Sequence, residues 1–571
     1  MGQMIVKEIT WERIHLYIDI EAAPDEDLGE DLRFYLVTKC GMVEAELEAR
    51  RLDDRRVRLA LNVTNSGINR CIGNGNYKIF ASADGVERTV PCFYGTSETL
   101  AAWSRNFNYR GCKGTYTISF MVDEYTEEPE LQLLIYNAEV STFSDKPDPV
   151  RAAKKKRCCF KTRVKRFFRT GCIWLQNLGY RLLRRLPRGG KKRVLFLSEK
   201  DESLALNMAA LYHRMVERGL DKELRIEFSL RNSAMKTYSK LSTFRMTWKV
   251  ARADVILVDD HIPLFDRLML GEDKTLIQIW HAGAGFKGVG YSRWGHYGCP
   301  GPFSAHRQYS YCICDSKEIA AFFSEQFGIL DEQIIPTGMP RMDQYVDPAN
   351  RLKVTERLYE TYPQFRGKKV ILFAPTYRGQ NRQKAYYPYE LIDFEGLYRY
   401  CCQDDTVVLF KMHPWVSEPV PIDPAYADRF FCLNDYGNIN ELFYITDLLI
   451  TDYSSSMYEF LLMNKPMLFF AFDKNQFATS RGFHRDYDSN VPGKICASFE
   501  ELLGAICAHD YEEEKVARFQ GRYFDHVDAG NCDRVIDWLI LGQLPEEYRS
   551  ALAAKRARIK EVRAMRFDME A

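Results

Sequence analysis

DLLITDYSSSMYEFLLMNKP, residues 447–466, combines a short apolar run, a serine-rich turn and a helical pattern. The run Leu448–Thr451 is typical of a buried strand, and apolar residues then recur at helical spacing until Lys465-Pro466 ends the pattern. A strand followed by a turn and a helix start leaves backbone N–H groups available, which is a common way of binding an anion. The simpler alternative is that the serines only cap the helix. We expect the anion-binding turn to comprise Asp452, Ser454, Ser455 and Ser456.

Similar apolar runs alternate with helical patterns from about residue 193 to residue 545, and the series begins again after Arg351. This alternation predicts two doubly wound α/β domains with parallel sheets, over 193–345 and 346–545. Ligands of such domains bind at the carboxyl ends of the strands and between the two halves. The expected strands are Val194–Leu197, Ile226–Phe228, Val255–Val258, Leu276–Trp280, Val370–Phe373, Val407–Phe410, Leu448–Thr451 and Met467–Phe470.

Polar clusters follow three further strands of this series. His281 opens the glycine-rich stretch WHAGAGFKGVG (280–290), which also contains Lys287, and glycines let a backbone approach a ligand closely. Arg378 ends FAPTYR (373–378), and Lys411 and His413 lie in FKMHP (410–414). One histidine at a strand end is more often structural than catalytic. Together with the serine turn, however, the four clusters favour a diphosphate site.

The first 145 residues follow a different pattern, in which apolar residues occupy every second position. Ile14–Ile20, Arg56–Val63 and Thr115–Phe120 read as strands separated by turn signals. Several short strands of this kind predict an antiparallel β-sandwich. No catalytic constellation is present, so the domain either binds a carbohydrate, polymer or partner, or is a plain structural appendage.

Length and composition limit the class of protein. A chain of 571 residues is expected to form two or three domains, and its 46% hydrophobic and 27% charged content is typical of soluble proteins. The sixteen cysteines lack zinc-site spacing and no signal peptide precedes them, so we expect reduced thiols in a cytosolic protein. No apolar run is long enough to cross a membrane.

The net charge of +1 conceals a basic segment at 146–192. Residues 151–193 contain seventeen lysines and arginines and no acidic residue, which leaves 62 basic and 78 acidic residues elsewhere. An apolar stripe with a cationic face predicts a helix lying on an anionic membrane surface. Nucleic acid is a weaker expectation, since no binding module accompanies the stripe; a helix docked on its own protein remains the alternative. A second basic helix is expected at 546–571. The stripe comprises Val164, Phe168, Leu175, Leu178, Leu182 and Leu186.

In chain order the sequence contains the motifs WHAGAGFKGVG, TGMPRMD (337–343), FAPTYR, KMHP, TDYSSSMYEFLLMNKP and RGFHRDYDSNVPG (481–493). Together these motifs resemble one family, the CDP-glycerol glycerophosphotransferases that build teichoic-acid-type polymers. The resemblance covers about residues 193–540 and implies a GT-B fold, a CDP-linked polyol donor, a lipid-linked polyol-phosphate acceptor and a peripheral, monotopic enzyme on the cytoplasmic membrane face. Two departures, AGAG after His281 and Glu459 where an Asp is common, leave the acceptor and the polyol open.

The resemblance also implies roles for the site residues. An acceptor hydroxyl would attack the donor phosphorus and release CMP, with His281 as general base. Arg378, His413 and the serine turn would neutralise the diphosphate. Asp452 would orient the turn, Glu459 would hold the ribose hydroxyls and Arg481 would close over the phosphates. No metal-ligand spacing is present, so we expect no cofactor, while Mg²⁺ on the donor is left open.

Other functions remain open at this point. We expect CDP-glycerol as the donor, with CDP-ribitol as the alternative. A GT-B glycosyltransferase that uses a UDP-sugar would have the same architecture but would react at an anomeric carbon. A membrane-bound assembly factor with an inactive cleft is a third alternative, against which the presence of His281, Arg378 and His413 argues.

Overall fold

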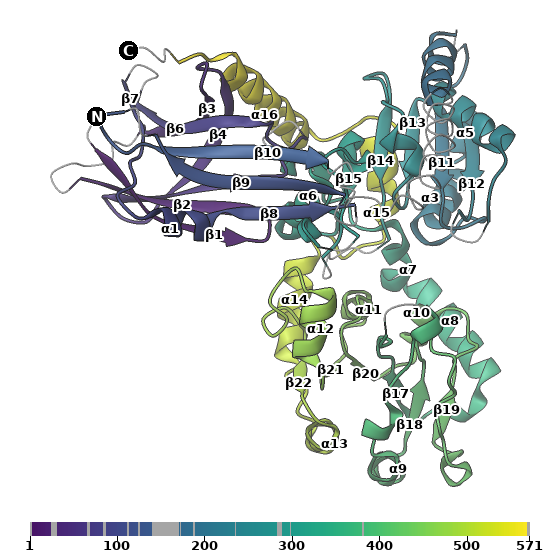
Figure 1. Ribbon diagram of the computed structural model, residues 1–571. Coiled ribbons are helices and arrows are strands. Elements are labelled where there is room, and N and C mark those ends of the chain that lie inside the picture. Colours follow the sequence, from purple (N-terminus) through teal and green to yellow (C-terminus); the bar gives the residue numbers. More distant parts are fainter. Residues whose placement is uncertain are drawn as a thin grey trace, which may run out of the picture.

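The computed structural model describes residues 3–23, 31–65, 69–83, 87–110, 113–123, 126–139, 171, 173–186, 189–233, 236–281, 288–296, 298–379 and 382–567. Figure 1 shows three bodies: an antiparallel β domain beside one parallel α/β domain, and a second parallel α/β domain below both. The predicted fold class is therefore confirmed.

The N-terminal domain is a single antiparallel sheet that bends around its own core as a half-barrel. Its order is β1-β2-β5-β4-β3-β6-β10-β9-β8, with β7 paired to β6. Residues 43–47 of β4 pair with β3, whereas residues 48–51 pair with β5, so this one strand passes from one half of the sheet to the other. The elements are β1 (Met4–Glu12), β2 (His15–Ala22), β3 (Arg33–Thr38), β4 (Val43–Arg51), β5 (Arg56–Asn62), β6 (Gly75–Ala83), β7 (Glu87–Thr89), α1 (Ser97–Trp103), β8 (Arg105–Tyr109), β9 (Gly114–Val122) and β10 (Leu131–Glu139).

The first α/β domain has a six-stranded parallel sheet in the order β12-β11-β13-β14-β15-β16. All four predicted strands form, but the one expected over Leu276–Trp280 ends at Gln278. The central strands β11 and β13 are almost entirely buried because helices cover both faces of the sheet, whereas the edge strand β12 is mostly half-buried. The main elements are β11 (Arg193–Ser198), α3 (Leu206–Glu217), α4 (Leu220–Glu223), β12 (Arg225–Leu230), α5 (Lys240–Arg252), β13 (Val255–Val258), β14 (Thr275–Gln278), β15 (Tyr311–Ile313), α6 (Ala320–Phe327), β16 (Ile334–Ile335) and α7 (Asp343–Val346).

The second α/β domain repeats this architecture with the order β19-β18-β17-β20-β21-β22. Its four predicted strands are confirmed, and β20 lies near the centre of the sheet, between β17 and β21. The elements are α8 (Pro348–Thr361), β17 (Lys369–Phe373), α9 (Phe394–Gln403), β18 (Thr406–Phe410), β19 (Phe430–Cys432), α10 (Ile439–Leu442), β20 (Leu448–Thr451), α11 (Ser456–Phe460), β21 (Met467–Phe470), α12 (Lys474–Arg481), β22 (Lys494–Cys496), α13 (Phe499–Ala508) and α14 (Glu514–Tyr523).

The C-terminal segment leaves this domain and returns to the other two. Asp533 of α15 (Asn531–Arg534) pairs with Arg214 of α3 at 2.7 Å. The expected basic helix is α16 (Glu546–Ala564), and its Arg558 pairs with Glu46 of β4 at 2.9 Å. In Figure 1 this helix lies along the β domain. The arginines of α16 therefore hold the β domain against the rest of the chain.

Part of the basic linker is also described. Residues 173–185 are helical and pack on α5, where Gln176 Nε2 donates to Thr247 Oγ1 at 2.9 Å and Tyr180 is buried. Residues 140–170, which contain most of the predicted cationic segment, lie outside the described residues. Among the residues that the structure describes, no helix is both long enough and apolar enough to span a bilayer.

Candidate functional site

The serine turn after β20 is built on the carboxylate of Asp452. This side chain is fully buried and accepts hydrogen bonds from the Thr376 backbone N–H at 2.8 Å and its hydroxyl at 3.1 Å. Ser455 is exposed, and Ser454 and Ser456 are half-buried. Since α11 has only five residues, its dipole is small, and the turn's own N–H and hydroxyl groups are its main donors. Asp452 thus fixes the shape of the turn, and the serines present donors at its surface.

The Arg378 guanidinium connects Asp452 of this turn to Asp473. Its Nε and Nη2 form a bidentate pair with Asp473 at 2.6 and 2.8 Å, and Nη1 donates to Asp452 at 2.9 Å. Burial disfavours the charged guanidinium, but the two carboxylates outweigh it and raise the pKa of Arg378. The guanidinium is therefore committed to protein carboxylates, and we interpret Arg378 as shaping the serine turn.

His413 and Lys411 follow β18 but differ in their surroundings. His413 Nδ1 accepts from the Trp415 backbone N–H at 3.2 Å, which places the imidazole proton on Nε2. The ring lies against Tyr377, with centroids 4.6 Å apart. Lys411 is buried, its Nζ donates to the Asn434 carbonyl at 2.7 Å, and burial lowers its pKa. His413 therefore carries a hydrogen-bond donor at Nε2, and Lys411 donates to a main-chain carbonyl within the domain.

His281 follows β14 in the other α/β domain and has the opposite tautomer. Its Nδ1 lies 3.2 Å from the Asp259 carbonyl, and because a carbonyl can only accept, Nδ1 must be the donor. Burial, together with the charges of Lys200 and Arg341, lowers the pKa of His281 below its ordinary value of 6.5. A neutral ring protonated at Nδ1 leaves Nε2 able to accept a proton, which is the requirement for a general base.

The backbone before His281 is held in an unusual conformation. Trp280 has a φ of +40°, a region that a bulky residue occupies only when its neighbours impose it. Asn207 of α3 supplies that constraint, since its Nδ2 donates to the carbonyls of Ile279 at 3.0 Å and Trp280 at 2.9 Å. The buried Asn207 side chain of α3 thus determines the backbone conformation just before His281.

Arg341 connects the His281 region of the first α/β domain to α11 of the second. No role was predicted for it from the sequence. Its Nη1 donates to the His281 carbonyl at 2.8 Å, and its Nη2 donates to Glu459 of α11. The same glutamate accepts from Tyr345 Oη at 3.0 Å. Glu459 is buried and paired, so it links the domains rather than presenting an open carboxylate to a ribose. The only signal in the sequence was the position of Arg341 inside the motif TGMPRMD.

Two predicted residues cannot be placed in the site. Lys287 lies outside the described residues, and Arg481 ends α12 with a side chain that the structure does not describe. Within the described ranges, no group of three or more His, Cys, Asp and Glu side chains is arranged to hold a metal ion. A second missed residue, Asp473, follows the end of β21 by three positions and could have been sought as a polar residue after a strand.

Two successive parallel α/β domains with polar groups at their strand ends define a GT-B-like protein. A structure of a variant of the wall teichoic acid polymerase TagF shows the same fold, with a TM-score of 0.52 and 22% identity over 71% of this chain and 100% of that chain. A model of the CDP-glycerol:poly(glycerophosphate) glycerophosphotransferase family matches residues 178–541, and the chain belongs to this family.

Curated relatives extend the comparison. The teichoic acid ribitol-phosphate polymerase TarL of Staphylococcus aureus is 39% identical over 60% of this chain and 61% of its own length. The teichoic acid poly(ribitol-phosphate) polymerase of Bacillus spizizenii is 36% identical over 67% of this chain and 61% of its length. The chain thus spans less than two thirds of either relative. Relatives named for glycerol phosphate match at 24% to 31% identity.

The buried Arg378 network predicts a large effect on stability. Arg378→Ala would leave the buried Asp452 and the partly buried Asp473 without a counter-charge, and breaking a buried pair typically costs about 3–5 kcal/mol. We expect calorimetry to show the unfolding transition of the second α/β domain at a clearly lower temperature. Arg399→Ala, which removes an exposed arginine of the same domain, should change the transition little. An unchanged transition in Arg378→Ala would contradict the assigned role.

Proposed function

We propose that this protein transfers a polyol phosphate from a CDP-polyol to a hydroxyl group of a teichoic-acid-type acceptor and releases CMP. Family membership supports this class of reaction. The sequence motifs by themselves favoured CDP-glycerol, but the relatives that match at 36% and 39% identity are named for ribitol phosphate. We therefore propose CDP-ribitol as the donor and keep CDP-glycerol as the second candidate.

The observation that carries the proposal is the pair of opposite histidine tautomers. An acceptor hydroxyl oxygen forms a bond to the donor's polyol-bearing phosphorus, and the bond from that phosphorus to the CMP oxygen breaks. His281 Nε2 takes the hydroxyl proton, because its Nδ1 is already protonated and bound to the Asp259 carbonyl. His413 Nε2–H donates to the diphosphate, where charge accumulates on the leaving group.

The serine turn supplies the remaining donors to the diphosphate. The surface of this turn presents Ser454, Ser455 and Ser456, and its geometry is supported by Asp452 and Arg378. Phosphoryl transfer depends mainly on positioning and charge stabilisation, so rigid donors are well suited to it. Arg341 would keep His281 aligned with this turn through Glu459.

We further propose that the helix over residues 173–185 lies on an anionic membrane surface, which would bring the enzyme to a lipid-linked acceptor. One side of this helix packs on α5 through Tyr180 and Gln176. The other side exposes a tryptophan and several leucines, and an exposed apolar stripe flanked by cations is typical of interfacial helices. The exposed side chains are Trp174, Leu175, Leu178, Leu182 and Leu186.

The nucleotide released separates the proposed reaction from glycosyl transfer. The protein is incubated with a lipid-linked polyol-phosphate acceptor and CDP-ribitol, CDP-glycerol or a UDP-sugar, and chromatography identifies the product. We expect CMP from CDP-ribitol, together with acceptor elongation, because attack at phosphorus leaves a nucleoside monophosphate. UDP from a UDP-sugar, with both CDP-polyols inert, would refute the proposal. A protein inert with every donor would favour the assembly-factor alternative.

The proposed base predicts both a mutant effect and a pH profile. His281→Ala should lower kcat by at least about 10²-fold with little change in donor affinity. Since the pKa of His281 is lowered, kcat/KM should be constant near neutral pH and fall only below about pH 6.5, where the ring becomes protonated. His213→Ala, an exposed histidine of α3, is the matched control. Equal losses of donor affinity and rate would make His281 a binding residue instead.

The membrane proposal predicts that polar substitutions on the exposed helix face release the protein from vesicles. Burying one such side chain contributes about 1.5–3 kcal/mol. The double variant Trp174→Glu/Leu178→Glu should therefore co-sediment with phosphatidylglycerol vesicles at least about tenfold more weakly than the parent. Native binding should also weaken with salt. Leu352→Glu, an exposed leucine of α8, is the control. Unchanged binding of the double variant would leave only the internal docking role.

A further inference from the structure

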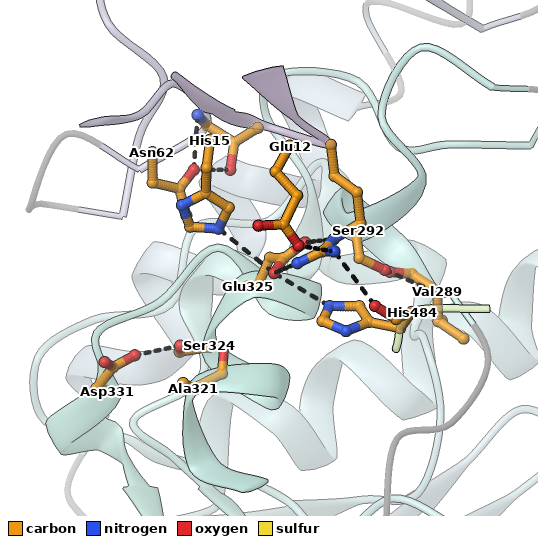
Figure 2. Close-up of polar contacts among 12 residues, drawn as sticks. Glu12, His15, Asn62, Val289, Ser292, Ala321, Ser324, Glu325, Asp331 and His484 are labelled. Carbon is orange, nitrogen blue, oxygen red and sulfur yellow. Dashed lines mark hydrogen bonds and ion pairs between the residues drawn. The ribbon is translucent and has the colours of Figure 1, made fainter. Parts of the chain in front are cut away.

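Three domains meet at the buried carboxylate of Glu325. This residue belongs to α6 of the first α/β domain and is 5% exposed. Arg13 of the β domain donates to it through Nε at 3.0 Å and Nη2 at 3.2 Å. His15 Nε2 of β2 lies 3.4 Å away and His484 Nε2 of the second α/β domain 3.0 Å away. Figure 2 shows His15 and His484 reaching Glu325 from different sides.

The cluster depends on charge. Burial would raise the pKa of Glu325, but its contacts with His15, His484 and Arg13 outweigh burial and lower it. An ionised carboxylate at such a depth is tolerated only when cations or donors surround it. Removal of Arg13 would therefore leave an uncompensated charge, and the neighbouring segments would have to move or admit water.

Arg13 also binds the backbone of the second α/β domain. It lies in the turn between β1 and β2 with a φ of +54°, and its Nη1 donates to the His484 carbonyl at 3.2 Å. A cavity of about 630 Å³ borders the segment 482–486 at this point. The contact of Arg13 with the His484 carbonyl thus connects this segment to the β domain at the border of the cavity.

The segment that Arg13 contacts packs against Tyr453 and Asp452, next to the serines of the turn. The rings of Phe483 and Tyr487 pack on Tyr453, with centroids 5.5 and 5.3 Å apart. Tyr487 Oη donates to the Asp452 carbonyl at 3.0 Å. A displacement of 482–487 would therefore reach the residue that shapes the proposed phosphate site.

The segment that follows the glycine-rich loop is also anchored in the β domain. Tyr291 and Trp294 are buried in the core of the half-barrel, where Trp294 stacks on Phe107 with centroids 5.1 Å apart. Arg307 reinforces this anchor, since its Nη2 donates to the Thr64 carbonyl at 2.6 Å. The β domain thus holds residues 288–296 on the His281 side and 482–487 on the serine-turn side.

We propose that the N-terminal β domain is a positioning part of the reaction site. Its Arg13, paired with Glu325 of the first α/β domain, aligns segment 482–487 with the donor-binding turn. The statement about donor binding rests on the proposed function. Neither side chain is placed in contact with substrate, so both are positioning residues. The β domain is then neither a plain appendage nor an independent binding module.

The test combines hydrogen exchange with kinetics in the full-length protein. In Arg13→Ala and Glu325→Gln, exchange without any donor should accelerate in peptides covering 482–487, while peptides of β20 keep their protection. The KM for the CDP-polyol should rise about five- to thirtyfold, with kcat changed much less. Arg13→Lys should recover part of the affinity, because a lysine restores the charge but not the bidentate contact. Arg56→Ala, an exposed arginine of the same domain, should match the parent.

Hydrogen exchange and KM together distinguish the positioning role of the β domain from the proposed transfer reaction. If no CDP-polyol reacts in the parent but exchange at 482–487 still accelerates in both variants, the proposed function fails and the positioning role stands. If exchange and KM stay at the parent values in Arg13→Ala, the positioning role is overturned, whatever the donor. Should Glu325→Gln fail to fold, Arg13→Ala and Arg13→Lys still decide the outcome.

Discussion

The buried network of Asp452, Arg378 and Asp473 is the constraint on which the second α/β domain depends. A carboxylate in the protein interior is stable only with a counter-charge and donors, so the three side chains must occupy one arrangement. That arrangement fixes the backbone that presents Ser454–Ser456 at the end of β20. A site made of backbone and hydroxyl donors can bind an anion well only if it does not reorganise, and the buried charges provide that rigidity.

A second set of buried polar contacts joins the domains. Arg341 contacts both the His281 carbonyl and Glu459, so the proposed base and the helix after the serine turn share one guanidinium. Glu325 and Trp294 extend this connection to the β domain. The residues that align the reacting groups are thus distributed over all three bodies, although the residues proposed to react belong to the two α/β domains.

Much of the architecture was predictable because it depends on local patterns. The period of apolar residues identified four of the six strands in each parallel sheet, and the serine turn after Leu448–Thr451 was found from the same pattern. The motifs around His281, Arg378 and His413 pointed to the family. The roles of individual side chains were less predictable: Arg378 and Glu459 looked available for ligand but are paired with Asp473 and Arg341, residues distant in the chain.

The sequence by itself determined the α/β class, the antiparallel N-terminal domain, the strand ends at which the polar residues lie and the family. These follow from periodicity and from motifs that are contiguous in the chain. The tertiary structure alone decided which histidine nitrogen holds the proton, which charged groups are already paired, and that the β domain completes the surroundings of the site. Each of these depends on contacts such as Arg13 with His484, which are 471 positions apart and therefore leave no periodic or local signal.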